Sequence, residues 1–127
     1  MEKILLDSDI FIDALRYFEP ATKFLKSLTE SNAPVFFSAV TEAELISGQA
    51  CADLAIKLKT LDMLSLFAKI PVTNKTAITA GDFRRTYGVT LQDSFIAATA
   101  FHLGAEVLTR NLQDFSKIKE ISARRPY

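Results

Sequence analysis

The chain has 127 residues, a length that predicts one domain with a hydrophobic core large enough to be stable without disulfides. Hydrophobic residues make up 49% and charged residues 24%, which fits a compact globular protein and excludes a disordered one. The 15 basic and 15 acidic side chains balance to zero. This excludes a uniformly basic surface for nucleic acid, although a local basic patch remains compatible.

The composition also bears on the compartment. The single cysteine, Cys51, cannot form an intramolecular disulfide, which indicates a reducing environment. No apolar run approaches the roughly 20 residues of a membrane helix, and Asp7 and Asp9 interrupt the apolar segment that a signal peptide would need. We therefore expect a cytoplasmic protein with no membrane association.

The first predicted elements are a buried strand at 4–6 and a helix that is capped by Ser8 or Asp9 and runs to about Tyr17. Pro20 suits the first turn of a second helix over 21–30. The remaining predicted strands cover 35–37, 70–72, 106–109 and a stretch near Ile118 and Ile121. The remaining predicted helices begin at Thr41, at Asp53, at 75 with Asn74 as the cap, at 93 and near Arg110.

The alternation of short strands and helices predicts an α/β fold in which a parallel sheet carries helices on both faces. The helix over 93–103 is apolar nearly all round, so it is predicted to be buried, with Gly104 as its C-cap. The leucine-rich stripe over 54–67 is interpreted mainly as core. The alternative for this stripe, and for Phe18 and Phe24, is a contact surface for a partner.

Acidic residues follow an apolar strand or turn at four helix starts. They are Asp7 with Asp9, Glu44, Asp93, and the pair Asn111 and Asp114. The carboxyl ends of parallel strands share one edge of a sheet, so these residues are expected to converge there. Carboxylates that share a crevice repel one another, and a hard divalent cation relieves that repulsion.

An alternative is that these residues only cap helices. Thr41 with Glu44 and Thr90 with Asp93 fit capping boxes, and Asn111 is a favourable N-cap. An acid in a first turn is stabilising by itself, by about 0.3–1 kcal/mol. Asp13 and Asp53 are interpreted as surface or helix-start charges.

Four segments, LLDSDIFID, SAVTEAELISG, LQDSFIAATA and LTRNLQDF, occur in the order seen in the PIN domain. Together they resemble this family, and specifically the VapC-like ribonuclease toxins of toxin–antitoxin modules. The resemblance implies a single domain over 1–127 with three α/β/α layers and a small, mainly parallel sheet flanked by helices. It also implies an endoribonuclease that uses Mg²⁺ or Mn²⁺, a cognate antitoxin and a homodimer.

The resemblance also implies the roles of individual residues. Asp7, Glu44 and Asp93 match the first three acids of the family. The fourth position holds the neutral Asn111, so Asp114 would supply the missing charge, and one or two metal ions both remain possible. Four residues are thus catalytic candidates, and with Asn111 they form the predicted metal site: Asp7, Glu44, Asp93 and Asp114. Ser8, Asp9 and Thr109 would orient these ligands or a bound water.

The candidate RNA-binding residues are Arg110, at the predicted sheet edge, and Arg84 and Arg85. A solvated helix face is the alternative for each of them. Arg124 and Arg125 could contact RNA or a partner, or could be flexible-tail charges. No Ser/His/Asp arrangement is visible, and the single histidine, His102, is interpreted as structural.

Two other functions remain open. In a haloacid-dehalogenase-type phosphatase, Asp7 would be the nucleophile and Asp9 the acid/base. The chain is short for that fold, however, and no convincing lysine and paired-acid motifs follow. In a non-catalytic PIN-like binding protein, the acids would serve only as helix caps.

Overall fold

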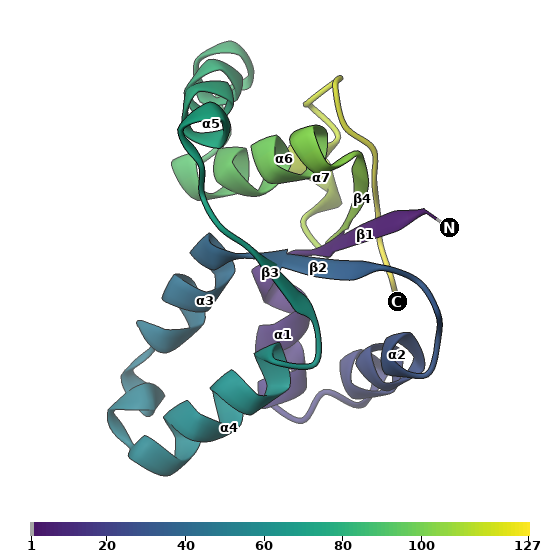
Figure 1. The fold of residues 1–127 in the computed structure, drawn as a ribbon, viewed down its shortest axis with the longest axis vertical. Coiled ribbons are helices and arrows are strands. Elements are labelled where there is room, and N and C mark those ends of the chain that lie inside the picture. The colour runs from purple at the N-terminus through teal and green to yellow at the C-terminus, as the bar shows by residue number, and fades with distance from the viewer. Residues whose placement is uncertain (1) are drawn as a thin grey trace.

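The strand β1 (Lys3–Leu6) lies at the centre of the sheet in this computed structural model, which describes residues 2–127 (Figure 1). The other strands are β2 (Val35–Ser38), β3 (Ala68–Ile70), β4 (Ala105–Leu108) and β5 (Ala123–Arg124). All the pairings are parallel, in the order β3-β2-β1-β4-β5. The chain builds outward from β1 to β3 and then returns to build on the other side of β1. The strand order therefore reverses between β1 and β4.

Helices cover both faces of this sheet. Figure 1 shows α5 and α6 on one side and α1 to α4 on the other. The helices are α1 (Ser8–Leu15), α2 (Glu19–Thr29), α3 (Ala39–Ile46), the 3₁₀ helix η1 (Gln49–Ala52), α4 (Leu54–Leu64), α5 (Asn74–Tyr87), α6 (Leu91–Leu103) and α7 (Leu112–Phe115). The predicted three-layer α/β/α fold is confirmed.

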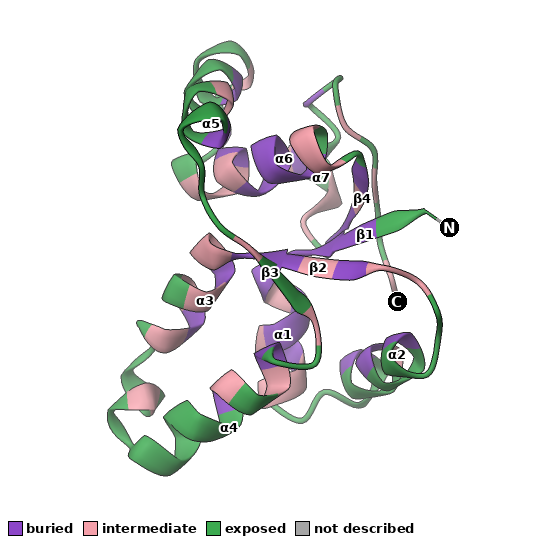
Figure 2. Cartoon of the chain, viewed as in Figure 1, coloured by how far each residue is buried: buried purple, intermediate pink, exposed green. Residues whose placement is uncertain are grey.

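The alternation of side chains along the central strands divides the core in two. Leu5 and Val107 belong to one apolar cluster, which packs against α5 and α6. Leu6 and Leu108 belong to the other cluster, which includes residues of α1 and α2. All four side chains are fully buried, so the central strands are covered on both faces (Figure 2).

The prediction of a buried helix at 93–103 is confirmed by α6. Ala97, Ala98 and Ala100 are almost completely buried, because small side chains let the helix lie close to the sheet and to α5. Gly104 ends the helix with φ 69°, as predicted for a left-handed cap.

Several predicted helix starts are wrong by one to three residues. Asp7, not Ser8 or Asp9, caps α1. Ser38, not Thr41, caps α3, and its hydroxyl accepts from the Val40 N–H at 3.0 Å. In each case the helix starts directly at the end of the strand, so the last strand residue or the one after it is the cap. Thr73 likewise caps α5 in place of Asn74.

The predicted last strand near Ile118 and Ile121 is also wrong. Ile118 lies after α7 and is buried in the core, and the strand forms later, at Ala123–Arg124. At the opposite edge, β3 stops at Ile70 because the following residue, Pro71, has no N–H to donate.

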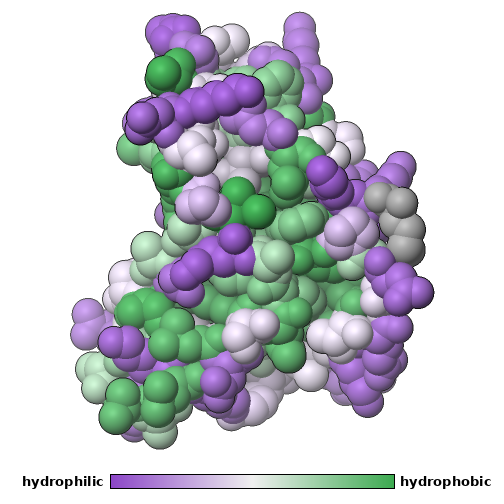
Figure 3. Space-filling view, viewed as in Figure 1, coloured by the Kyte–Doolittle hydropathy of each residue, from purple (hydrophilic) through white to green (hydrophobic). Residues whose placement is uncertain are grey.

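The apolar stripe of α4 is only partly core. Leu64 is buried, but Leu54 is 65% and Leu58 is 52% exposed. Figures 1 and 2 show α4 reaching away from the sheet with most of its surface exposed. The core interpretation is therefore wrong for the first half of the stripe, which is an exposed apolar surface (Figure 3).

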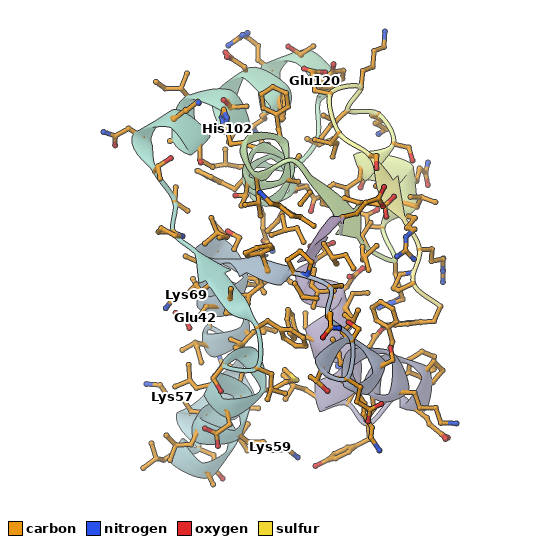
Figure 4. The ribbon with its side chains drawn as sticks, turned by 45° about the vertical axis from the view of Figure 1, so that its right-hand side comes forward. Glu42, Lys57, Lys59, Lys69, His102 and Glu120 are labelled. Carbon is orange, nitrogen blue, oxygen red and sulfur yellow. The ribbon has the colours of Figure 1, made fainter. Side chains whose placement is uncertain are left out.

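Some polar side chains have plainly structural roles. His102 of α6 is hydrogen-bonded to Thr79 of α5, with 2.7 Å between its Nε2 and the hydroxyl oxygen. Lys69 of β3 forms an ion pair with Glu42 of α3 (Figure 4). Within residues 2–127, no helix has the length and apolar character needed to cross a membrane.

Candidate active site

Asp7 lies where β1 ends, at the point between β1 and β4 at which the strand order reverses. Its N–H donates to the Leu108 carbonyl of β4 at 3.0 Å. One carboxylate oxygen accepts from the Ser8 N–H, and the other accepts from the Thr109 hydroxyl, both at 2.8 Å. Only 6% of Asp7 is exposed. Open α/β sheets bind their ligands in the crevice at this reversal.

Asp9 faces the same strand end from the first turn of α1. Its Oδ2 accepts from the Arg110 N–H at 2.8 Å and lies 3.4 Å from the Thr109 hydroxyl. Its Oδ1 is buried and has no hydrogen-bond partner among the described residues. A buried, unpartnered carboxylate oxygen is unfavourable unless a cation or a water reaches it.

Asp93 comes to this edge from the first turn of α6. The Thr90 hydroxyl accepts from the Asp93 N–H at 3.1 Å, so the predicted cap at Thr90 is confirmed. Asn111 uses its amide nitrogen to donate to Asp93 at 3.2 Å and to Asp114 at 3.0 Å. Asn111 precedes α7 but makes no capping hydrogen bond with its side chain. Its amide instead links two carboxylates.

Glu44 lies inside α3 and accepts a hydrogen bond from Gln92, the residue before Asp93 on α6. The predicted capping box of Thr41 with Glu44 does not form. Thr41 is buried instead, and its hydroxyl is 2.9 Å from that of Ser8. The Ser8 hydroxyl therefore ties α1 to α3, while the Ser8 N–H holds the Asp7 carboxylate.

The carboxylates are electrostatically coupled. Burial first, and then the charges of Asp9 and Asp93, raise the pKa of Asp7 to about 7 against the opposing hydrogen bonds from Thr109 and Ser8. Burial also raises the pKa of Asp9. The pKa of Asp93 is raised by burial, with further contributions from Asp114, Glu44 and Asp9. Acids from four separate segments of the chain thus repel one another at one edge of the sheet.

Asp114 differs from the other acids of this group. Its pKa is lowered, first by the hydrogen bond from Asn111 and then by Lys117, whose Nζ is 3.3 Å from Oδ1. Asp114 therefore stays ionised without a metal ion, whereas Asp7 and Asp93 are charged only at a cost.

The donor chemistry of this edge fits a hard cation. Carboxylate and amide oxygens are the ligands that Mg²⁺ and Mn²⁺ accept, and Mg²⁺ generally takes only one or two carboxylates and keeps several waters. Among residues 2–127, no three His, Cys, Asp or Glu side chains stand close enough to hold one ion together. The acids therefore border a common space rather than form a closed cage, and the metal-ligand set stays a prediction.

The family model of the PIN domain matches residues 4–121. The chain belongs to the PIN domain family. It is 27% identical to a chain of a toxin–antitoxin complex from Klebsiella pneumoniae, with 98% of both chains covered and a TM-score of 0.81. It is 28% identical to a chain of FitAcB from Neisseria gonorrhoeae, with 97% of both chains covered and a TM-score of 0.76.

A chain of DNA-bound VapBC from Salmonella typhimurium is 24% identical over 100% of both chains, with a TM-score of 0.85, which shows the common fold. No curated protein matches significantly. The predicted resemblance to VapC-like PIN-domain toxins is confirmed. PIN domains of this type are nucleases that generally use divalent metal ions. The match leaves the haloacid-dehalogenase alternative without support.

The sequence predicts Asp13 to be a surface or helix-start charge, but the structure places it, buried, beside this site. Only 8% of Asp13 is exposed, and it binds the Arg110 guanidinium through both oxygens, at 2.5 and 2.9 Å. The sequence feature that could have indicated this position is the spacing of Asp9 and Asp13, which lie four residues apart and so on one face of α1. Asp53 is exposed and caps α4, as predicted.

The other predicted RNA-binding arginines lie apart from this network. Arg84 donates to the Val89 carbonyl, and Arg85 forms an ion pair with Asp82 on α5. Within the described part of the chain, neither is hydrogen-bonded or ion-paired to the acids of the site. Their role in RNA binding stays a prediction.

Proposed function

We propose that this PIN domain is a metal-dependent endoribonuclease that acts as the toxin of a toxin–antitoxin pair. The observation that carries the proposal is the gathering of mutually repelling carboxylates at the reversal between β1 and β4. Asp7 is the clearest case, because it is buried and its pKa is raised to about 7. Helix capping alone would not require acids from distant segments to share this edge.

The proposal gives each residue a separate task. Asp7 and Asp93 are the direct ligands, because burial and mutual repulsion leave their charges the least compensated. A bound divalent cation would neutralise them and would supply the Lewis acidity that phosphodiester hydrolysis needs. Glu44 and Asp114 complete the acidic border of the space. Asp9 offers its unpartnered Oδ1 to a water or to the ion.

Thr109 and Asn111 keep these ligands in place. The Thr109 hydroxyl donates to Asp7 and accepts from the Asn111 N–H at 2.9 Å, which fixes the rotamer of the buried carboxylate. Asn111 then holds Asp93 and Asp114 together through its amide group. Because Asn111 is neutral and Asp114 is compensated by Asn111 and Lys117, less negative charge is left for a second ion, and we propose that one ion is enough.

Single-stranded RNA is the proposed substrate. Arg110 lies beside the acids, with its N–H on Asp9 and its guanidinium on Asp13. This arrangement places a fixed positive charge next to the proposed ion, where it favours the approach of a phosphate group.

An antitoxin is the proposed protein partner, because the chain resembles those of toxin–antitoxin complexes. Two adjoining apolar hollows of about 390 and 410 Å³ lie between α4 and the helices α1 to α3. Leu15 and Lys59 line both of them, and the exposed leucines of α4 extend the apolar surface (Figure 3). An apolar segment of the antitoxin would fit there. The predicted homodimer stays part of the proposal.

The test is cleavage of RNA by the whole protein with Mg²⁺, with Mn²⁺ and with EDTA. Asp7→Asn, Glu44→Gln and Asp93→Asn should each reduce cleavage to the level of the EDTA control while far-UV circular dichroism stays unchanged. Asp114→Asn should weaken metal affinity less, because Asp114 is already compensated by Asn111 and Lys117. Metal-independent folding with no cleavage of any RNA would instead favour the non-catalytic alternative.

A further inference from the structure

A basic, aromatic pocket adjoins the acidic site. It has a volume of about 680 Å³, which lies in the usual range of ligand sites. Three arginines line it, together with a single acidic side chain, Asp13. The arginines are Arg16 at the end of α1, Arg110 after β4, and Arg125 after β5. In a chain with no net charge, this is a local concentration of positive charge.

Arg110 belongs to both the acidic site and the pocket. Its N–H donates to Asp9 at 2.8 Å, and its guanidinium is held by Asp13 at the pocket wall. The acidic site and the pocket are therefore separated by no more than the length of Arg110, so an RNA chain in the acidic site would also reach the pocket. The Asp13 carboxylate is fully used, since it also accepts from the Tyr127 hydroxyl at 2.7 Å.

The other two arginines are available to a ligand. Both are exposed, and within residues 2–127 neither Arg16 nor Arg125 forms an ion pair with an Asp or Glu side chain. Arg125 donates through Nε to the main-chain oxygen of Tyr127, the last residue of the sequence, at 3.1 Å, and its other guanidinium nitrogens form no hydrogen bond within residues 2–127. Arg124 provides a contrast, because it is ion-paired with Glu106 at 2.7 Å.

Aromatic rings form the rest of the pocket wall. The rings of Phe18 and Tyr127 meet edge to face with their centroids 5.8 Å apart, and Phe24 supports Tyr127 from another side at 6.2 Å. Phe18 is 48% exposed and Tyr17 is 77% exposed, so apolar ring surface faces the solvent at this pocket. Aromatic faces interleaved with arginines are the combination that binds single-stranded nucleic acid.

We propose that this pocket is a subsite for one nucleotide of the RNA, next to the phosphodiester bond that is cleaved. Arg16 and Arg125 bind its phosphate, and the base packs against the Phe18 and Tyr127 wall. An acidic protein segment would satisfy the arginines but would leave the aromatic wall without a planar partner. The inference rests on the proposed function for its substrate, but it concerns binding and can be tested without cleavage.

The experiment measures binding of a fluorescein-labelled, single-stranded 12-nucleotide RNA of mixed sequence to the whole protein by fluorescence anisotropy. All proteins carry Asp7→Asn, so the RNA stays intact. Arg16→Gln and Arg125→Gln should each weaken binding about tenfold, the effect of losing one charged hydrogen bond. Each should also reduce the slope of log K against log salt by about 0.7, since one phosphate contact is lost. Arg124→Gln is the matched control and should change neither quantity.

Three results would overturn the subsite. They are no RNA binding at all, equal effects of Arg124→Gln and Arg125→Gln, or Arg16→Gln and Arg125→Gln weakening a labelled glutamate decapeptide but not the RNA. The last result would assign the pocket to an acidic protein segment. Arginine-dependent RNA binding by these Asp7→Asn proteins, combined with no cleavage of any RNA by the protein with Asp7 intact, would keep the subsite and refute the nuclease. The two proposals therefore fail separately.

Discussion

Asp7→Asn should stabilise the metal-free protein at neutral and alkaline pH. Folding raises the pKa of Asp7 from 3.8 to about 7, so the folded state holds this proton more tightly than the unfolded state does. The contribution of Asp7 to stability is therefore most favourable below about pH 4 and is lost as the pH rises through 7. A difference of roughly three pH units corresponds to about 4 kcal/mol above pH 7.

The substitution preserves the local structure. Asparagine is as good an N-cap as aspartate, so its side-chain oxygen can still accept from the Ser8 N–H. Its amide nitrogen would face the Thr109 hydroxyl oxygen, which can accept while its hydrogen turns toward Asp9. Removal of the charge is then the main change, and the free energy of unfolding should rise by up to about 4 kcal/mol at pH 8 and hardly at all at pH 4.

The assay is urea unfolding followed by far-UV circular dichroism, since the chain has no tryptophan. It is run at pH 4 and pH 8 in EDTA and repeated with Mg²⁺, which should stabilise the wild type at pH 8 and have less effect on the variant. Asp53→Asn changes another N-cap aspartate, one that is exposed, and should leave the pH dependence unchanged. If Asp7→Asn is no more stable than wild type at pH 8, the buried carboxylate is not under strain and the reasoning fails.

Three further predictions follow from particular contacts. Asn111→Asp should raise Mg²⁺ affinity, measured by titration calorimetry, and lower stability in EDTA, because it replaces the amide that donates to Asp93 and Asp114 with a further acid. Lys59 lowers the pKa of Tyr17 through a hydrogen bond of 2.7 Å, so Lys59→Gln should raise that pKa in an ultraviolet titration. Lys57 lies on the opposite side of α4, and Lys57→Gln should leave the pKa of Tyr17 unchanged (Figure 4). Tyr17 has φ 60°, so Tyr17→Gly should retain stability or raise it by up to about 1 kcal/mol in urea unfolding; a clear loss would contradict this.

The strands and their carboxyl-end acids could be predicted from the sequence because they depend on local patterns. An apolar run that ends in Asp7 indicates a buried strand wherever it stands, and the layer architecture follows from alternation alone. The α4 stripe could not be assigned in the same way. Helical periodicity marks an apolar face, but it does not say whether the chain or another molecule covers that face.

The roles of Asp13 and Tyr127 were beyond sequence reasoning for a different reason. Both act through a contact that spans 114 positions of the chain, and it forms only because β5 pairs with β4 and brings the last residues over α1 and α2. A cap or a turn is specified by neighbouring residues, whereas this contact depends on the whole sheet being in place. Asn111 is an intermediate case: its place at the sheet edge could be predicted from the sequence, but its hydrogen bonds to Asp93 and Asp114 could not.

On the proposed function, Arg110 would link metal binding to RNA binding. A site with several uncompensated carboxylates repels the phosphate that it must bind, and a single divalent ion only partly reverses that charge. Arg110 brings a backbone N–H to Asp9 and a guanidinium to Asp13, so positive charge stands on the side from which a nucleic-acid chain would enter.

If Tyr127 holds Asp13 in its rotamer, Tyr127→Phe should loosen the Arg110 guanidinium. RNA binding should then weaken while Mg²⁺ affinity stays constant, whereas Tyr87→Phe, which removes a comparable phenol–carboxylate bond to Glu120, should affect neither. Equal losses of metal and RNA affinity in Tyr127→Phe would mean that the tyrosine only supports the fold.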